Sequence, residues 1–214
     1  MRVEIAGTGR ALPGAMVPST AFDRRLGLPE GRTGVASRAV CGDESQVDLA
    51  AAAARAALDD AGLASSQIGL VIGASAVPYQ PIPATAPLVM ARLGIPEGLA
   101  AAFDVNSTCL SFLTGFETAA RMLEGRAALV FSSELASRAL PWDRAPEIAG
   151  LCGDGAAAAV LRPASEGSKA RLAASLMRTY PSAYTACGIG AGGTRFDFTA
   201  EPDTFRAHAL FAMD

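Results

Sequence analysis

The chain has 214 residues, of which 50% are hydrophobic, and a formal net charge of −3. Such a chain can bury a sizeable core, and its Lys and Arg residues are scattered rather than gathered in a basic stripe, so nucleic-acid binding has little support. No stretch reaches the roughly 20 apolar residues of a membrane span, and the N-terminus lacks the apolar run of a signal peptide. The four cysteines are far apart and follow none of the paired spacings of zinc sites. We therefore expect a soluble, cytoplasmic protein without a bound metal.

The N-terminal region predicts one strand followed by turns. Residues 1–6 alternate apolar and polar side chains, and we expect Gly7 and Gly9 to end the strand. The spacing of these glycines differs from that of a dinucleotide-binding loop, and prolines follow where that motif needs a helix, which indicates a turn. Residues 19–44 predict a short helix and loops. Arg32 and Arg38 lie near a turn there, where they either meet an anionic ligand or are solvated, and composition favours solvation.

The middle of the chain alternates between strand and helix patterns. Apolar runs of strand length cover residues 68–74, 101–105 and 127–132, and helical patterns cover residues 45–61, a stretch ending near Leu93 and a stretch from Cys109 to Gly125. With short connections, this alternation predicts an α/β fold in which helices cover both faces of a mostly parallel sheet.

The last third is less regular. Gly153 and Gly155 flank Asp154, which on its own predicts a tight turn, and small apolar residues then run to Leu161. We expect a surface connection over residues 163–169, strands over residues 170–179 and 207–213, and a glycine-rich loop between these strands.

Cys109 is the candidate nucleophile. It follows a short apolar strand and opens a predicted helix, where unpaired N–H groups and the helix dipole stabilise a thiolate. A buried cysteine that acts only as a small hydrophobic residue is the alternative that the local pattern leaves open.

Several short segments in one order resemble the ketoacyl synthase III branch of the thiolase superfamily. They are Arg32-Thr-Gly-Val, Leu70-Val-Ile, Leu93-Gly-Ile, Phe103-Asp-Val with Cys109 and Phe112, Ser133-Glu134 and Gly153-Asp-Gly-Ala. The resemblance implies a thiolase-like fold with a mostly parallel five-stranded sheet. Residues 1–165 then form the N-terminal half that carries the nucleophile, and residues 166–214 form a connection and the first strand of an incomplete C-terminal half.

The same resemblance implies the chemistry. Cys109 takes an acyl group from acyl-CoA or acyl carrier protein and condenses it with a malonyl unit by decarboxylative Claisen chemistry, in fatty acid or polyketide biosynthesis. The coenzyme A or phosphopantetheine thioester is a substrate, and no further cofactor is expected. The His and Asn that stabilise the enolate belong to the C-terminal half, so we expect a fragment that is inactive alone. We interpret His208, the only histidine, as structural or exposed.

Substrate contacts and dimerisation are also implied by the resemblance. Leu28 stands where relatives place a tryptophan that stacks on adenine, and Ser111 stands where many relatives have glycine. The Pro78–Pro87 loop is the expected contributor to a homodimer, with Ile82 crossing into the partner's acyl pocket, and the glutamate base of olefin-pathway relatives is missing near this position. The implied substrate-binding residues are Arg32, Thr33, Leu28, Ile82, Leu151, Cys152 and Met213.

Two other functions remain open at this point. One is an acyl-cysteine transferase that forms esters or amides without decarboxylation. The other is a non-catalytic subunit that stabilises an active homologue, in which Cys109 would stay unacylated.

Overall fold

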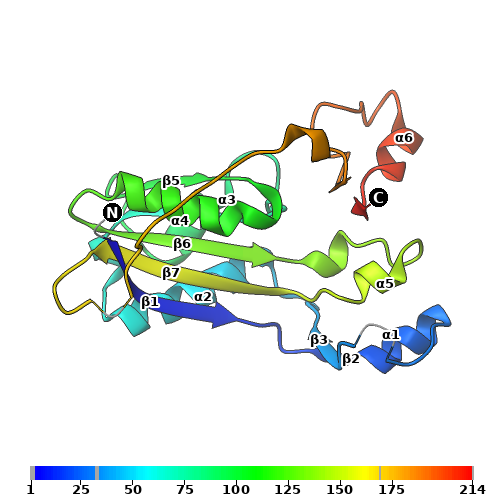
Figure 1. The fold of residues 1–214 in the computed structure, drawn as a ribbon, viewed down its shortest axis with the longest axis horizontal. Coiled ribbons are helices and arrows are strands. Elements are labelled where there is room, and N and C mark those ends of the chain that lie inside the picture. Colours follow the sequence, from blue (N-terminus) through cyan, green and yellow to red (C-terminus); the bar gives the residue numbers. More distant parts are fainter. Residues whose placement is uncertain (1–2, 32–33, 169, 214) are drawn as a thin grey trace. The chain divides into compact units, whose positions relative to one another are not determined.

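The computed structural model describes residues 3–31, 34–168 and 170–213, which form two compact units (Figure 1). The first unit combines Met1–Pro13, Gly42–Glu134 and Gly155–Leu176, and the second combines Gly14–Cys41, Leu135–Asp154 and Met177–Asp214. Both units therefore draw on separate stretches of sequence. The sequence analysis placed a boundary between an N-terminal half, residues 1–165, and the start of a C-terminal half, residues 166–214. This division stays a prediction.

A five-stranded sheet in the order β1-β7-β6-β4-β5 forms the centre of the first unit. β4 is parallel to both of its neighbours, whereas β7 is antiparallel to β6 and to β1. Four strands therefore run in one direction and β7 alone runs against them, which confirms the mostly parallel sheet expected from the sequence. The strands are β1 (Val3–Ala11), β4 (Ile68–Gly73), β5 (Ala101–Asp104), β6 (Ala127–Glu134) and β7 (Gly155–Pro163).

Helices cover both faces of this sheet. The first unit contains α2 (Gln46–Ala61), α3 (Thr85–Arg92) and α4 (Ser111–Met122). Gly115 of α4 packs against Ile72 and Val130 on one face. On the other face, the Ser133 hydroxyl donates to the carbonyl of Gln46 at 2.8 Å, which places α2 there. Figure 1 shows α4 in front of the sheet and α2 partly hidden behind it.

The contact between β1 and α2 explains why β1 is longer than expected. A methyl group at Gly7 would lie 2.5 Å from the carbonyl oxygen of Ala57, and one at Gly9 would lie 2.1 Å from that of Ala53. The helix backbone therefore packs directly on the strand, and only glycine leaves room for it. The prediction that Gly7 and Gly9 end the strand is wrong, because they are packing positions inside it.

Local signals predicted α2 correctly. The Ser45 hydroxyl accepts a hydrogen bond from the Asp48 N–H at 3.1 Å, and Gly62 ends the helix with a left-handed φ of 64°. The apolar runs in β4 and β6 are almost entirely buried, as expected for strands covered on both faces.

The second unit consists of short elements. They are β2 (Met16–Pro18), α1 (Ser19–Leu26), β3 (Ser37–Ala39), α5 (Pro146–Ala149), β8 (Cys187–Gly188), α6 (Pro202–Ala207) and β9 (Ala212–Met213). β2 pairs with β3 and β8 pairs with β9, both antiparallel. Across the described part of the chain, no helix combines the length and apolarity needed to cross a bilayer.

Two strand predictions near the C-terminus are wrong. Within residues 170–179 only the first few residues pair, through a bridge between Arg171 and Glu4 and a hydrogen bond from the Leu172 N–H to the carbonyl of Val3 at 2.9 Å. The following residues extend without a neighbouring strand. Residues 207–213 begin as the end of α6 and include only the two residues of β9, because a short apolar run fits either periodicity.

Candidate active site

Cys109 lies in a single 3₁₀ turn, Thr108–Leu110, directly before α4. The thiol is free and exposed, so the buried-cysteine interpretation is wrong. The sequence predicted that Cys109 opens the helix itself, whereas the α-helix begins two residues later, at Ser111. The thiol is therefore presented from the turn that leads into the N-terminus of α4.

Side chains on either side of Cys109 fix this turn. Thr108 has a φ of 51°, a left-handed conformation that costs a non-glycine residue about 1–3 kcal/mol. The Ser111 hydroxyl accepts from the Ser107 N–H at 2.9 Å and donates to the carbonyl of Thr108 at 2.6 Å. Ser111 is almost fully buried. Ser111 thus closes the turn around Cys109.

The backbone N–H of Cys109 is available to a ligand. Among the hydrogen bonds of the described residues none uses it, whereas the Leu110 N–H is bonded to the carbonyl of Ser107 at 3.1 Å. An N–H beside a nucleophilic sulfur can donate to the oxyanion that forms when the sulfur attacks a carbonyl.

The segment that follows β4 lies beside this turn and is held by hydrogen bonds from Asn106, which follows β5, and from residues of β6. The Asn106 amide donates to the carbonyl of Ala76 at 2.8 Å, and the Ser133 N–H donates to the Ser75 hydroxyl at 3.1 Å. Glu134 accepts from the Ala76 N–H, and from the Val77 N–H at 3.4 Å. Asn106 and Glu134 therefore hold the same short piece of backbone.

Glu134 is a half-buried carboxyl at the end of β6. Burial raises the pKa of Glu134 above its ordinary value of 4.5, although the hydrogen bonds from Ala76 and Val77 act in the opposite direction. The sequence marked Ser133-Glu134 only as part of a resemblance. In the structure, the carboxylate accepts hydrogen bonds from the N–H groups at the start of the proline-rich loop.

Asp104 fixes the other end of that loop. Its carboxylate accepts from the N–H groups of Thr85 at 2.6 Å and Ala86 at 2.8 Å, which caps the N-terminus of α3. A pocket of about 190 Å³ lies under the loop, with Asp104 and Asn106 in its lining. Ile82, between the two anchored ends, is 87% exposed.

The other predicted substrate residues fall in the second unit or outside the described residues. Arg32 and Thr33 lie outside the described residues. Leu28 follows α1 and donates its N–H to the carbonyl of Asp23 at 2.8 Å. Leu151, Cys152 and Met213 are exposed, Met213 within β9. Of the predicted site residues that the structure describes, Cys109 and Ile82 belong to the first unit. Leu28, Leu151, Cys152 and Met213 belong to the second.

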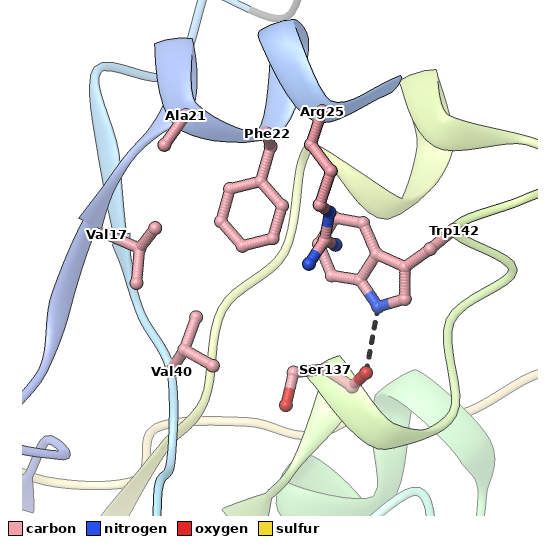
Figure 2. Close-up of a pocket in the computed structure, with 7 residues that line it drawn as sticks. All are labelled: Val17, Ala21, Phe22, Arg25, Val40, Ser137 and Trp142. Atoms are coloured by element: carbon pink, nitrogen blue, oxygen red, sulfur yellow. Dashed lines mark hydrogen bonds between the residues drawn. The ribbon is translucent and has the colours of Figure 1, made fainter.

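The second unit contains a pocket that sequence reasoning missed (Figure 2). It has a volume of about 490 Å³, and none of the predicted substrate residues in the described part of the chain lines it. Trp142 stacks on Phe22 with 4.7 Å between ring centroids, and its Nε1–H donates to the carbonyl of Ser137 at 2.9 Å. Figure 2 shows the Arg25 side chain beside these rings. The only signal in the sequence was the lone tryptophan.

Arg38 is buried, so the interpretation of a solvated cation is wrong for this residue. It donates to the Ser19 hydroxyl at 3.1 Å and to the carbonyl of Gly150, and it lies 4.8 Å from the Phe22 ring centroid. Burial lowers the pKa of Arg38, while the charges of Asp23 and Cys152 act in the opposite direction. The guanidinium therefore fastens β3 to α1 and to the end of α5.

Asp154 does more than the expected tight turn requires. Its carboxylate accepts from the Cys41 N–H at 2.8 Å, and from the N–H and hydroxyl of Ser137 at 2.8 and 2.7 Å. A methyl group at Gly153 would lie 3.0 Å from the carbonyl oxygen of Ala39, which explains the preceding glycine. Asp154 is thus a structural anchor within the second unit.

Comparison with known proteins gives one consistent result. The family model described as 3-Oxoacyl-[acyl-carrier-protein (ACP)] synthase III matches residues 103–181. The 3-oxopimeloyl-[acyl-carrier-protein] synthase of Rhodothermus marinus is 37% identical over 221 residues, covering 100% of this chain and 63% of the relative. The beta-ketoacyl-[acyl-carrier-protein] synthase III of Rhizorhabdus wittichii is 41% identical over 184 residues, covering 82% of this chain and 56% of the relative.

Solved structures agree. The crystal structure of 3-oxoacyl-(acyl carrier protein) synthase III, FabH, from Pseudomonas aeruginosa PAO1 superimposes with a TM-score of 0.85 at 29% identity, covering 100% of this chain and 65% of that one. The priming beta-ketosynthase from the R1128 polyketide pathway, at 20% identity, has a TM-score of 0.81 and supports the fold alone. The chain spans less than two thirds of the length of the relatives named here.

Proposed function

Because the chain belongs to the ketoacyl synthase III-like condensing enzymes of the thiolase superfamily, we propose that Cys109 accepts an acyl group as a thioester from acyl-CoA or an acyl carrier protein. The observation that carries the proposal is the exposed Cys109 thiol in the turn before α4, beside its own unbonded N–H. The carrier thioester, of coenzyme A or phosphopantetheine, is the substrate of this step and not a resident cofactor.

The chain's own groups suit this transfer. The thiolate attacks the carbonyl carbon of the carrier thioester, and the Cys109 N–H donates to the oxyanion that forms. When the oxyanion collapses, the bond to the carrier sulfur breaks and the carrier leaves as its thiolate. Because a thiolate is also a good leaving group, the acyl group can later be passed to carbon.

We further propose that the acyl group is condensed with a malonyl unit on a carrier protein. The malonyl carboxylate leaves as CO₂, the freed electron pair forms the new carbon–carbon bond, and Cys109 leaves as a thiolate. The His and Asn that the family resemblance implies for this step are assigned to a C-terminal half that complements these 214 residues. His208 supports this assignment, since it is exposed and stacks on Phe196 at 4.7 Å within the second unit.

A homodimer is part of the proposal. β5 forms one edge of the sheet, with β4 as its only neighbour among the described strands. The loop between β4 and α3 exposes the large apolar side chains of Val77, Tyr79 and Ile82. An exposed apolar loop anchored at both ends suits burial against a second copy of the chain.

A condensation assay tests the whole proposal. Incubated with acyl-CoA and malonyl carrier protein, the chain alone should form acyl-Cys109 but no 3-oxoacyl product. Addition of the C-terminal half should give product and one CO₂ for each acyl group consumed, and Cys109→Ala should abolish both.

Each other outcome of this assay contradicts one part of the proposal. Turnover by the chain alone would contradict the need for a C-terminal half, and turnover by Cys109→Ala would contradict the nucleophile. Ester or amide formation without CO₂ release would contradict condensation and favour the transferase alternative.

A further inference from the structure

The turn that carries Cys109 is held by one side chain that reaches in two directions. The Thr108 N–H donates to the Asn106 Oδ1 at 3.1 Å, and the Asn106 Nδ2 donates to the carbonyls of Ala76 at 2.8 Å and Ser75 at 3.3 Å. Asn106 thus joins the residue before the nucleophile to the backbone that follows β4.

The Thr108 end of this link lies at an unusual backbone conformation. Thr108 is the only non-glycine residue with a positive φ among the described residues, and a β-branched side chain disfavours that region. Such a residue keeps its conformation only where surrounding contacts impose it. The hydrogen bond from its N–H to Asn106 is one such contact, and the bond from the Ser111 hydroxyl to its carbonyl is another.

The far end of the link is itself fixed. The Ser133 N–H holds the Ser75 hydroxyl, the Glu134 carboxylate holds the Ala76 N–H, and Gln46 Nε2 donates to the carbonyl of Val77 at 2.8 Å. Residues of β6 and α2 supply these hydrogen bonds. The carbonyls that accept from Asn106 therefore belong to a segment that is itself held in place.

The chemistry of the link requires an amide. One end must accept from an N–H while the other donates to carbonyl oxygens, and a carboxamide carries both groups. A carboxylate of the same shape would keep the acceptor for Thr108 but would face the carbonyls of Ser75 and Ala76 without a proton to donate. Alanine would remove both contacts.

We propose that Asn106 is a positioning residue that aims the Cys109 sulfur for acyl transfer by holding Thr108 in its left-handed conformation against the Ser75–Ala76 backbone. The inference rests on the proposed acyl transfer at Cys109. Asn106 acts through Thr108 and makes no proton transfer itself. Its effect should therefore lie in the rate of the oriented attack on a thioester rather than in the intrinsic reactivity of the thiol.

The test compares two reactions of Cys109 in the 214-residue chain. Asn106→Ala and the isosteric Asn106→Asp are measured beside Ser107→Ala, a neighbour in the same turn whose hydroxyl makes no hydrogen bond among the described residues. The first reaction is acylation by acyl-CoA over a range of concentrations, followed by mass spectrometry. The second is alkylation by iodoacetamide, a small reagent that reaches the sulfur from many directions.

We expect both Asn106 variants to lower the saturating acylation rate by about 10- to 100-fold, because a small misplacement of a reacting group has effects of this order. The acyl-CoA concentration at half saturation and the alkylation rate should stay close to those of the wild type, and Ser107→Ala should match the wild type in both reactions. If Asn106→Ala fails to fold, Asn106→Asp carries the test alone.

Two results would overturn the inference. Unchanged acylation in the Asn106 variants, or an equal loss of acylation and alkylation, would show that Asn106 does not aim the sulfur, while acylation of the wild type would leave the proposed function standing. No acylation of the wild type would overturn the proposed function and this inference together.

Discussion

At the scale of single residues, short polar side chains determine where the Cys109 thiol lies. Ser111 closes the turn from the helix side, and Asn106 ties it to the segment after β4. Each hydrogen bond of this kind contributes about 1 kcal/mol net, and one unsatisfied partner costs more than the bond gains. The geometry of the site therefore depends on small polar residues that take no part in the chemistry themselves.

Glu134 gives a prediction that depends on pH. Because burial raises the pKa of this carboxyl in the folded state, the folded protein binds a proton there more readily than the unfolded chain. The contribution of Glu134 to stability is thus complete below its ordinary pKa of 4.5 and declines as the pH rises through the folded-state pKa. The free energy of unfolding of the wild type should therefore fall relative to that of Glu134→Gln as the pH rises above 4.5.

Urea unfolding of both proteins across this range measures the difference. Glu166→Gln, which replaces an exposed carboxyl of the first unit, is the control and should show no such trend. A constant difference between Glu134→Gln and the wild type would contradict the assignment of Glu134 as a carboxyl whose pKa is raised by burial.

The sequence singled out Cys109 as the candidate nucleophile but not the side chains that hold its turn. Cys109 stands out because a strand, a cysteine and a helix follow one another locally. Asn106 could not, because its partners Ser75 and Ala76 lie about thirty positions away and only the parallel pairing of β4 and β5 brings them together. Arg38 was assigned to solvent for the same reason, since its burial depends on Gly150, far along the chain.

At the scale of elements, α2 packs against β1 more closely than any other pair of segments in the first unit where a glycine lies at the contact. A Cβ at Gly9 would lie 2.1 Å from the carbonyl oxygen of Ala53, which is backbone and cannot move without bending the helix. The alanine-rich face of α2 and the glycines of β1 are therefore two halves of one contact.

Gly9→Ala should destabilise the protein by about 3 kcal/mol or more, because overpacking against backbone cannot be relieved by a rotamer change. Gly167→Ala is the matched control, since a methyl group there meets nothing within 4 Å, and its effect should stay within about 0.5 kcal/mol. Chemical denaturation of the two variants measures both values. Equal stability of the variants would contradict the close approach of α2 to β1.

Element prediction succeeded where burial and periodicity agree. β4, β6 and α2 carry long patterns, and their caps or flanking glycines mark the ends. It failed for residues 170–179, because most of this segment has no strand to pair with. The predicted β1 was also too short. Gly7 and Gly9 are typical of a turn, and their packing against α2 cannot be read from the local sequence.

At the scale of the whole molecule, the chain is similar to relatives of which it spans less than two thirds. The proposed acyl-accepting group, Cys109, and the hydrogen bonds that hold its turn are present in these 214 residues. The proposal assigns the decarboxylation step to residues that a C-terminal half supplies. Acylation of Cys109 and the decarboxylative condensation can therefore be measured separately.

The proposed homodimer predicts an effect of charge in the loop between β4 and α3. The wild type should sediment as a dimer, and Ile82→Asp should shift the equilibrium towards monomer, because a carboxylate would be buried in an apolar interface. Leu176→Asp is the control, since Leu176 is also exposed, at 77%, and lies outside the loop. Analytical ultracentrifugation measures all three. A wild-type monomer, or an unchanged dimer in Ile82→Asp, would contradict the role of the loop.

The most direct test of the central claim is the site of acylation. The protein is incubated with acyl-CoA, digested, and each of the cysteines 41, 109, 152 and 187 is examined by mass spectrometry. The account predicts that the acyl mass is found on Cys109, and that Cys109→Ser leaves the other three cysteines unmodified. An unmodified Cys109, or an acyl group on another cysteine instead, would contradict it.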